Sequence, residues 1–138
     1  MRSTILRVLP ATLLLLVGAA GCGKGYQRVQ GKVTFEDGAP LTKGMVVFEG
    51  LGEAPVTARG DVGRDGSYRL GTDRPGDGVP PGKYRVLITP LVENPDAPER
   101  PAFDPRYTSF ATSGLEFEVK AGQNDYPIQV SRAEKGRR

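Results

Sequence analysis

The stretch Lys83–Thr89, with the sequence KYRVLIT, decides the fold class because its apolar residues recur at every second position. One apolar face consists of Tyr84, Val86 and Ile88. A period of two residues is typical of a β-strand that buries one of its faces. We therefore predict a strand over residues 83–89, with this face directed into a hydrophobic core.

Similar short apolar segments recur along the chain between residues that favour turns, namely glycine, proline and aspartate. No segment shows the 3.6-residue periodicity of an amphipathic helix. The predicted strands cover residues 28–35, 45–48, 55–62, 67–70, 83–89, 115–119 and 126–130. Seven short strands joined by turns indicate an all-β fold, and we expect a small antiparallel β-sandwich that is transthyretin-like or immunoglobulin-like.

The connections between these strands carry their own signals. Arg64-Asp65-Gly66 is typical of a hairpin turn. Residues 72–82 are rich in glycine, proline and aspartate and are expected to form a loop, and residues 121–125 a turn. Residues 90–112 contain five prolines and are expected to form a long crossover, with at most one helical turn near residues 103–110.

Composition and charge limit the class of protein. A chain of 138 residues suits one domain, and its 19 glycines and 12 prolines suit short strands joined by turns. The net charge of +3 falls to +1 without the first 21 residues, because Arg2 and Arg7 lie there and no acid does. A nearly neutral chain gives no electrostatic reason to expect nucleic acid as a partner. Residues 133–138 are predicted to be a basic, solvated tail.

The first 21 residues have the organisation of an export signal. Two arginines lie at the start, an apolar core follows at Val8–Val17, and small residues occupy Gly18–Gly21. The uncharged run from Val8 to Cys22 is 15 residues long, shorter than the ~20 residues that a permanent membrane-spanning helix needs. We therefore predict that residues 1–21 are a cleaved signal peptide.

The end of this leader, Ala19-Ala20-Gly21-Cys22, resembles the bacterial lipobox, in which small residues precede a lipid-accepting cysteine. The family prefers leucine where Ala19 stands. The resemblance implies cleavage between Gly21 and Cys22, a diacylglyceryl thioether on the Cys22 sulfur and an acyl chain such as palmitate on the new amino group. Two or more acyl chains anchor a protein stably. The alternative is an ordinary secretory signal with an incidental cysteine.

Cys22 is the only cysteine of the chain, so no disulfide can form within it, and lipidation accounts for an otherwise unexplained exported thiol. Residues 22–26 are then a lipidated tether. Gly23 stands where aspartate tends to retain lipoproteins of diderm bacteria in the inner membrane, so the resemblance favours the outer membrane. We expect the protein in the cell envelope, held at a membrane and facing the periplasm or the cell surface.

Four motifs in the rest of the chain have an order and spacing that match a known family of domains. They are Gln30–Phe35, Asp37–Leu41, Asp65–Tyr68 and Pro80–Val86. Together they resemble the carboxypeptidase regulatory-like domain, a transthyretin-like or prealbumin-like fold, over residues 27–132. The resemblance implies a prealbumin-like sandwich with an accessory, structural or binding role rather than peptidase activity.

The side chains that most enzymes use are scarce in this chain. It has no histidine, which excludes Ser-His-Asp and Cys-His catalysis and histidine-ligated zinc, and its single cysteine excludes thiolate metal sites. Asp61, Asp65, Asp73 and Asp77 lie in or beside turns, where they either shape the turns or gather loosely around a cation. We predict no catalytic residue, no metal site and no cofactor other than the lipid, and we expect that the protein is not an enzyme.

Three aromatic residues are candidates for a binding surface. Tyr84 follows Pro-Gly at the start of a strand, where it could stack on a sugar or bridge a corner of the sandwich, and its inward phase favours the corner. Tyr107 and Phe110 lie in the long crossover. They are candidates for an exposed contact surface or, alternatively, for packing over the open end of the core.

These observations predict a membrane-anchored, exported lipoprotein whose β-sandwich has a structural or protein-binding role, with envelope proteins as its partners. The alternative function is a carbohydrate-binding module of the cell envelope. The absence of tryptophan counts against that alternative, because sugar-binding platforms favour tryptophan.

Overall fold

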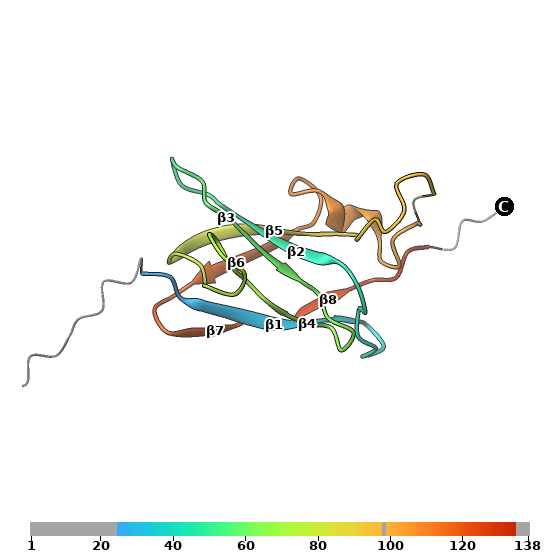
Figure 1. Cartoon of the computed structure of the whole chain (residues 1–138), viewed down its shortest axis with the longest axis horizontal. Coiled ribbons are helices and arrows are strands. Elements are labelled where there is room, and N and C mark those ends of the chain that lie inside the picture. Colours follow the sequence, from blue (N-terminus) through green and yellow to red (C-terminus); the bar gives the residue numbers. More distant parts are fainter. Residues whose placement is uncertain (1–24, 98, 135–138) are drawn as a thin grey trace, which may run out of the picture.

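The computed structural model describes residues 25–97 and 99–134, so the predicted signal peptide, Cys22 and residues 135–138 lie outside the described residues. The described part is all-β, as predicted, with two four-stranded sheets that face each other and one short 3₁₀ helix, η1 (Figure 1). The elements are β1 Arg28–Phe35, β2 Met45–Gly50, β3 Thr57–Asp61, β4 Ser67–Arg69, β5 Gly82–Thr89, η1 Pro105–Thr108, β6 Leu115–Val119, β7 Gln123–Asp125 and β8 Ile128–Val130.

The first sheet has the strand order β3-β2-β5-β6 and is antiparallel throughout. The predicted strand around KYRVLIT is β5, which lies between β2 and β6. Its predicted inward face is confirmed, because Tyr84 is 3% exposed and both Val86 and Ile88 are 0% exposed. The alternation of apolar and polar residues in β5 therefore predicts which side of the strand the second sheet covers.

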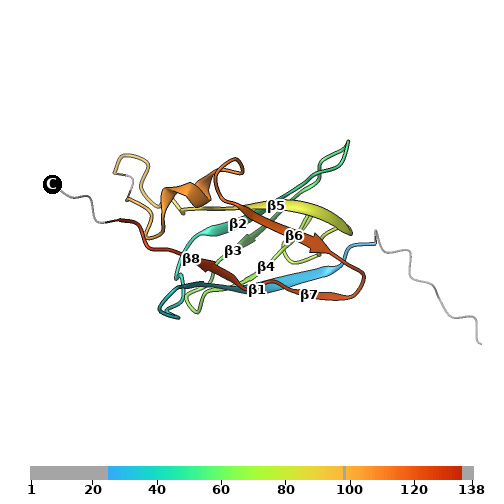
Figure 2. The ribbon, with the colours of Figure 1, turned by 180° about the vertical axis from the view of Figure 1, so that it is seen from behind.

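The second sheet differs from the prediction of seven antiparallel strands. β1 pairs antiparallel with β4 but parallel with both β7 and β8, so the sandwich has eight strands and is of mixed direction (Figure 2). β6 ends at Val119, which pairs with Gly82 at the end of the sandwich where β1 starts. The chain therefore enters the second sheet running in the same direction as β1.

β7 lies within residues 121–125, where the sequence predicts only a turn. β7 and β8 both run alongside β1 and pair with it, and Tyr126 and Pro127 separate the two strands along the chain. Pro127 has no N–H to donate to a ladder, which interrupts the strand. At the interruption a Cβ atom on Gly31 would lie 2.0 Å from the carbonyl oxygen of Tyr126, so this close approach of two chains requires glycine.

The turn at Asp65-Gly66 also differs from its predicted role. The sequence indicates a hairpin, but β3 pairs with β2 in the first sheet and β4 pairs with β1 in the second. Gly66 takes a φ of 81°, as a tight turn demands, and the Gly63 N–H donates to the carbonyl oxygen of Ser67 at 2.9 Å. The turn therefore passes the chain between the two sheets instead of joining neighbours within one.

The core fills the space between the sheets. Phe48 is 0% exposed, and its ring centroid lies 5.8 Å from that of Tyr84 and 6.0 Å from those of Phe117 and Tyr126. Every buried side-chain nitrogen or oxygen atom in the described part has a hydrogen-bond partner. This aromatic cluster joins β2, β5 and β6 of one sheet to the chain between β7 and β8 of the other.

The crossover at residues 90–112 contains the one helical turn that the sequence predicts. Asp104 caps η1, because its carboxylate accepts a hydrogen bond from the Arg106 N–H at 2.9 Å. The segment is fixed to the C-terminal strand region by hydrogen bonds from Asp104 N to Ser131 O and from Ala133 N to Ala102 O, both 3.0 Å. Within the part of the chain that the structure describes, no helix is long and apolar enough to cross a membrane.

An arginine-lined groove as the candidate functional site

Two ends of the sandwich are used as reference points below. The tether end is where β1 starts, and it comprises Tyr26, the loop at residues 71–81 and the turn at residues 120–122. The crossover end is where β1 stops, and it comprises residues 36–44, residues 90–108 and residues 131–134. The two ends lie at opposite sides of the molecule in Figure 1.

Tyr84 forms the predicted corner of the sandwich at the tether end. Its hydroxyl donates to the carbonyl oxygen of Pro80 at 2.8 Å, and burial raises the pKa of this hydroxyl. The ring packs on Phe48 in the core. This geometry confirms the structural alternative for Tyr84 and leaves its ring face covered, so it offers no sugar platform.

Tyr107 does not belong to an exposed contact surface. It is 4% exposed and lies in the core, and its hydroxyl accepts hydrogen bonds from Arg106 at 2.5 Å and from the Ser131 N–H at 3.4 Å. The structure shows the alternative given for Tyr107, in which the crossover folds back and the ring packs over the open end of the core. Phe110 is half-buried, with the Arg85 guanidinium 4.9 Å above its ring.

All ten tyrosine and phenylalanine residues of the chain lie in the described part, and each of them is buried or half-buried. Aromatic stacking on sugars needs an exposed ring face. The surface therefore gives no support to the carbohydrate-binding alternative.

The acidic residues of the turns form the turns themselves. The Asp65 carboxylate accepts from the Ser67 hydroxyl at 2.6 Å and from the Ser67 N–H at 3.1 Å, and these bonds lower its pKa. The Asp77 carboxylate accepts from the backbone N–H groups of Thr72, Asp73 and Arg74 at 2.7, 3.2 and 3.0 Å. Among the described residues, no group of three or more acids, cysteines or histidines is arranged to hold a metal ion.

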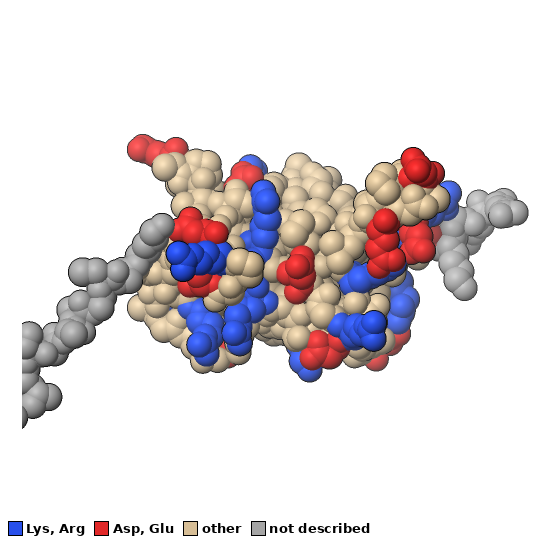
Figure 3. All heavy atoms as spheres, viewed as in Figure 1, with Lys and Arg blue, Asp and Glu red and all other residues tan. Residues whose placement is uncertain are grey.

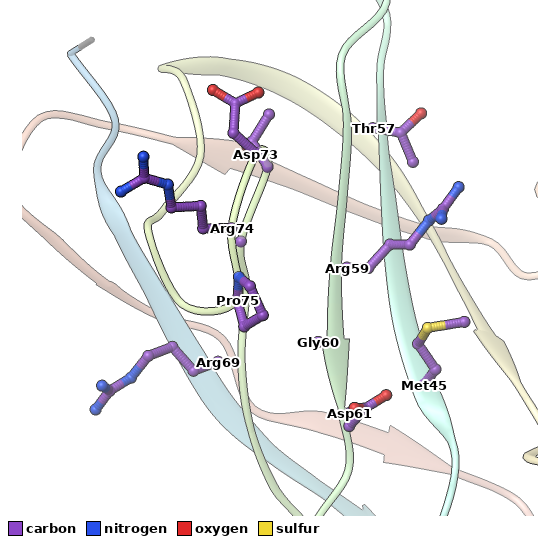
Figure 4. Close-up of a pocket in the computed structure, with 11 residues that line it drawn as sticks. Met45, Thr57, Arg59, Gly60, Asp61, Arg69, Asp73, Arg74 and Pro75 are labelled. Carbon is purple, nitrogen blue, oxygen red and sulfur yellow. The ribbon is translucent and has the colours of Figure 1, made fainter.

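A groove of about 440 Å³ runs between β3 and the segment that leaves β4 (Figure 4). It is lined by Met45, Thr57, Arg59, Gly60, Asp61, Arg69, Gly71, Thr72, Asp73, Arg74 and Pro75. One wall comes from β2 and β3 of the first sheet, and the other comes from the end of β4 and the loop that follows it. The groove therefore lies where the edges of the two sheets meet.

Two glycines make the floor of this groove. The backbones of Arg59 and Gly71 exchange N–H···O hydrogen bonds of 2.9 Å in both directions, which joins the two sheets at this edge. A Cβ atom on Gly71 would lie 2.0 Å from the carbonyl oxygen of Arg74, and one on Gly60 would lie 2.4 Å from that of Arg69. Any larger residue at either position would push these backbone segments apart, so both positions require glycine.

Arg59, Arg69 and Arg74 are the cationic side chains of the groove. All three are exposed, and none of them forms an ion pair with a carboxylate of the described part. Arg69 and Arg74 extend on the loop side of the groove, and Arg59 extends on the β2 side (Figure 4). A band of Lys and Arg side chains crosses this face of the molecule (Figure 3). Unpaired guanidinium groups retain their donors for an anion.

Two acids also line the groove, and each lies close in sequence to one of its arginines: Asp73 directly precedes Arg74, and Asp61 is on β3 with Arg59. The Asp73 carboxylate accepts a hydrogen bond from the Tyr26 hydroxyl at 2.9 Å, and Asp61 is at the opposite end of β3, where it pairs with Met45 in the ladder. The sequence did not predict this site. Arg59 and Arg69 are outward residues of two separate strands, and nothing in their spacing indicates that they flank one groove.

The described fold is a small two-sheet β-sandwich, and comparisons with known proteins add little to that class. No family model and no curated protein matches the chain. The solved structure of a 9R-lipoxygenase from Cyanothece PCC8801 aligns with 76% of this chain and 16% of its own chain, with 15% identical residues and a TM-score of 0.39. A likeness at this level carries no argument about function.

The prediction that the protein is not an enzyme is corrected: the solved structure that aligns with the chain is that of an enzyme, so the comparison does not support the prediction, and at a TM-score of 0.39 it assigns no activity either. That prediction depended on the missing histidine and the single cysteine, which exclude only particular kinds of catalysis. It is therefore withdrawn, and no lipoxygenase activity is inferred in its place.

Proposed function

We propose that the protein is exported, cleaved before Cys22 and anchored to a membrane of the cell envelope through lipid on that residue, where its β-sandwich acts as a binding module. The observation that carries the proposal is the position of Cys22, the single cysteine of the chain, directly after a leader that ends in small residues. One acyl chain binds membranes marginally, whereas two or three hold a protein stably at the surface.

The start of the folded domain supports the same proposal. Tyr26 is the fourth residue after Cys22, and its hydroxyl already donates to Asp73 of the loop at the tether end. Gln27 pairs with Val79 through N–H···O bonds of 2.8 Å in both directions. A lipid on Cys22 would therefore hold the tether end, rather than the crossover end, next to the membrane.

The anchoring half of the proposal is tested on the full chain produced in a diderm bacterium. Intact mass of the purified product is expected to show a chain that begins at Cys22 and carries diacylglyceryl and N-acyl groups, all in the membrane fraction. Cys22→Ala is expected to lose the acyl mass, while Gly23→Ala keeps it. A Cys22→Ala protein that is cleaved and remains on the membrane would overturn the proposal.

The binding half of the proposal is tested by crosslinking in the native membrane. A photoreactive side chain at Thr57, in the groove wall, is expected to capture a defined envelope component that the same probe at Gln129 does not capture. Both positions are exposed and lie on different sheets. Identical products at both positions, or none at either, would count against a binding role for this face.

A further inference from the structure

We propose that the arginine-lined groove binds the phosphate group of an anionic lipid headgroup in the membrane leaflet that holds the anchor. This inference rests on the proposed anchoring at Cys22 and adds a second, specific contact between the sandwich and the membrane. It is carried by two observations: the three exposed arginines of the groove have no carboxylate partner in the described part of the chain, and the loop that carries Arg74 contacts Tyr26, which is close to Cys22 in the sequence.

The chemistry of the groove fits a phosphate. A guanidinium group offers a planar pair of donors that matches two phosphate oxygens, and it stays charged at any physiological pH. The Arg69 stem passes over Gly76, where a Cβ atom would lie 3.2 Å from the Arg69 Cδ. Arg74 is positioned by its backbone, whose N–H donates to Asp77 at 3.0 Å. Both arginines therefore lie on the loop side of the groove, and neither forms an ion pair with a carboxylate of the described residues.

The groove has room for the ligand. Its volume of about 440 Å³ is larger than a single phosphate group needs. The Asp73 carboxylate, which would repel an anion, is engaged by the Tyr26 hydroxyl at 2.9 Å. The same hydrogen bond fixes the start of the domain against the loop that carries Arg74.

The tether selects a lipid over other phosphates. Three residues separate Cys22 from Tyr26, so even a fully extended tether keeps their Cα atoms within about 14 Å. Tyr26 contacts the loop that carries Arg74, which places the groove within reach of the headgroup layer. A basic side chain near an anionic membrane surface strengthens binding by about fivefold. Anchoring therefore raises the local concentration of lipid phosphate around the groove.

The experiment uses the acylated protein in lipid vesicles. Because lipid occupies the Cys22 sulfur in the proposed form, a Pro75→Cys variant has one free thiol, which is labelled with a small fluorophore at the rim of the groove. Nitroxide-headgroup lipid quenches the fluorophore when the groove is docked. Quenching is compared in vesicles of phosphatidylcholine alone and in vesicles that also contain phosphatidylglycerol, at equal ionic strength.

The expected result is stronger quenching with phosphatidylglycerol, with a docked-to-undocked ratio that falls about fivefold in Arg69→Gln and again in Arg74→Gln. The matched control is Arg64→Gln, which removes the same charge from an exposed position in the turn between β3 and β4. Equal losses in all three variants would overturn the groove and leave only general charge attraction. Quenching that ignores phosphatidylglycerol would overturn the proposal outright.

A further arm separates the two sources of phosphate. Inorganic phosphate is added in place of chloride at constant ionic strength, and selective loss of docking at low phosphate concentration would assign the groove to a soluble phosphate instead of a lipid. Intact mass of the same sample distinguishes the failure of the two proposals. An acylated protein that does not dock refutes the groove alone, whereas an unacylated Cys22 refutes the anchoring and the membrane docking together.

Discussion

Two arginines at the crossover end, Arg106 and Arg132, bond to other side chains of the fold, whereas the arginines of the groove have no carboxylate partner in the described part of the chain. Arg132 donates to the Asp37 carboxylate at 2.7 Å, and its guanidinium lies 4.0 Å from the centroid of the Phe35 ring. In the groove, Arg59, Arg69 and Arg74 have no carboxylate partner within the described residues.

The difference follows from what each end has to cover. At the crossover end a proline-rich segment closes the core, and charged side chains fix that segment over apolar rings such as Phe35 and Tyr107. In the groove, glycine backbones close the edge between the sheets without help from side chains. The guanidinium groups of the arginines there are exposed to solvent, and their N–H donors can therefore bind an anion.

The largest expected effect is at the crossover end. Tyr107→Ala is expected to lower the free energy of unfolding by about 3–5 kcal/mol, because it removes a buried ring and leaves a cavity. Chemical denaturation measures the loss. Phe110→Ala, on a half-buried ring, is the control and should lose much less. Equal losses for the two variants would mean that the crossover does not close the core through Tyr107.

The second effect concerns the floor of the groove. Gly71→Ala is expected to cost about 1–3 kcal/mol of unfolding free energy, since its new Cβ meets the carbonyl oxygen of Arg74 and forces the walls apart. Gly52→Ala places a Cβ where no atom lies within 4 Å and is the control. A Gly71→Ala protein as stable as Gly52→Ala in denaturant titration would contradict the close approach at this edge.

A smaller effect compares the two sets of arginines directly. Arg132→Ala is expected to lower the free energy of unfolding by about 1 kcal/mol through the lost contact with the Phe35 ring. Arg59→Ala, Arg69→Ala and Arg74→Ala should each change it by less than about 0.5 kcal/mol. A groove variant that destabilises the fold as much as Arg132→Ala would show that the comparison between the two regions is wrong.

The smallest expected effect is on how the stability of the fold changes at acidic pH. A hydrogen bond from Arg132 and then one from the Ala39 N–H hold the pKa of Asp37 below its ordinary value of 3.8. A lowered folded-state pKa contributes stability above the unfolded value, and that contribution is lost as the pH falls through the folded value. The thermal midpoint of Asp37→Asn should therefore fall less steeply below about pH 4 than that of the unaltered protein. Parallel curves would contradict the pairing.

Much of the first sheet could be predicted from the sequence, because each of its strands shows which face is buried. The inward face of β5 and the corner made by Tyr84 were predicted correctly for this reason. β7 was missed because three residues are too short for a period, and the turn at Asp65-Gly66 was misread because a turn sequence does not reveal whether its flanking strands share a sheet. The groove was missed entirely, since its arginines meet only across two sheets.

The sequence by itself determined the all-β class and the inward faces of the strands, because these depend on residue type and local period. The tertiary structure decided the parallel pairing of β7 and β8 with β1, the burial of Tyr107 and the meeting of β3 with the loop after β4. The physical reason is that a period of two fixes the face that each strand buries. The choice of neighbour depends on packing between segments far apart in the chain.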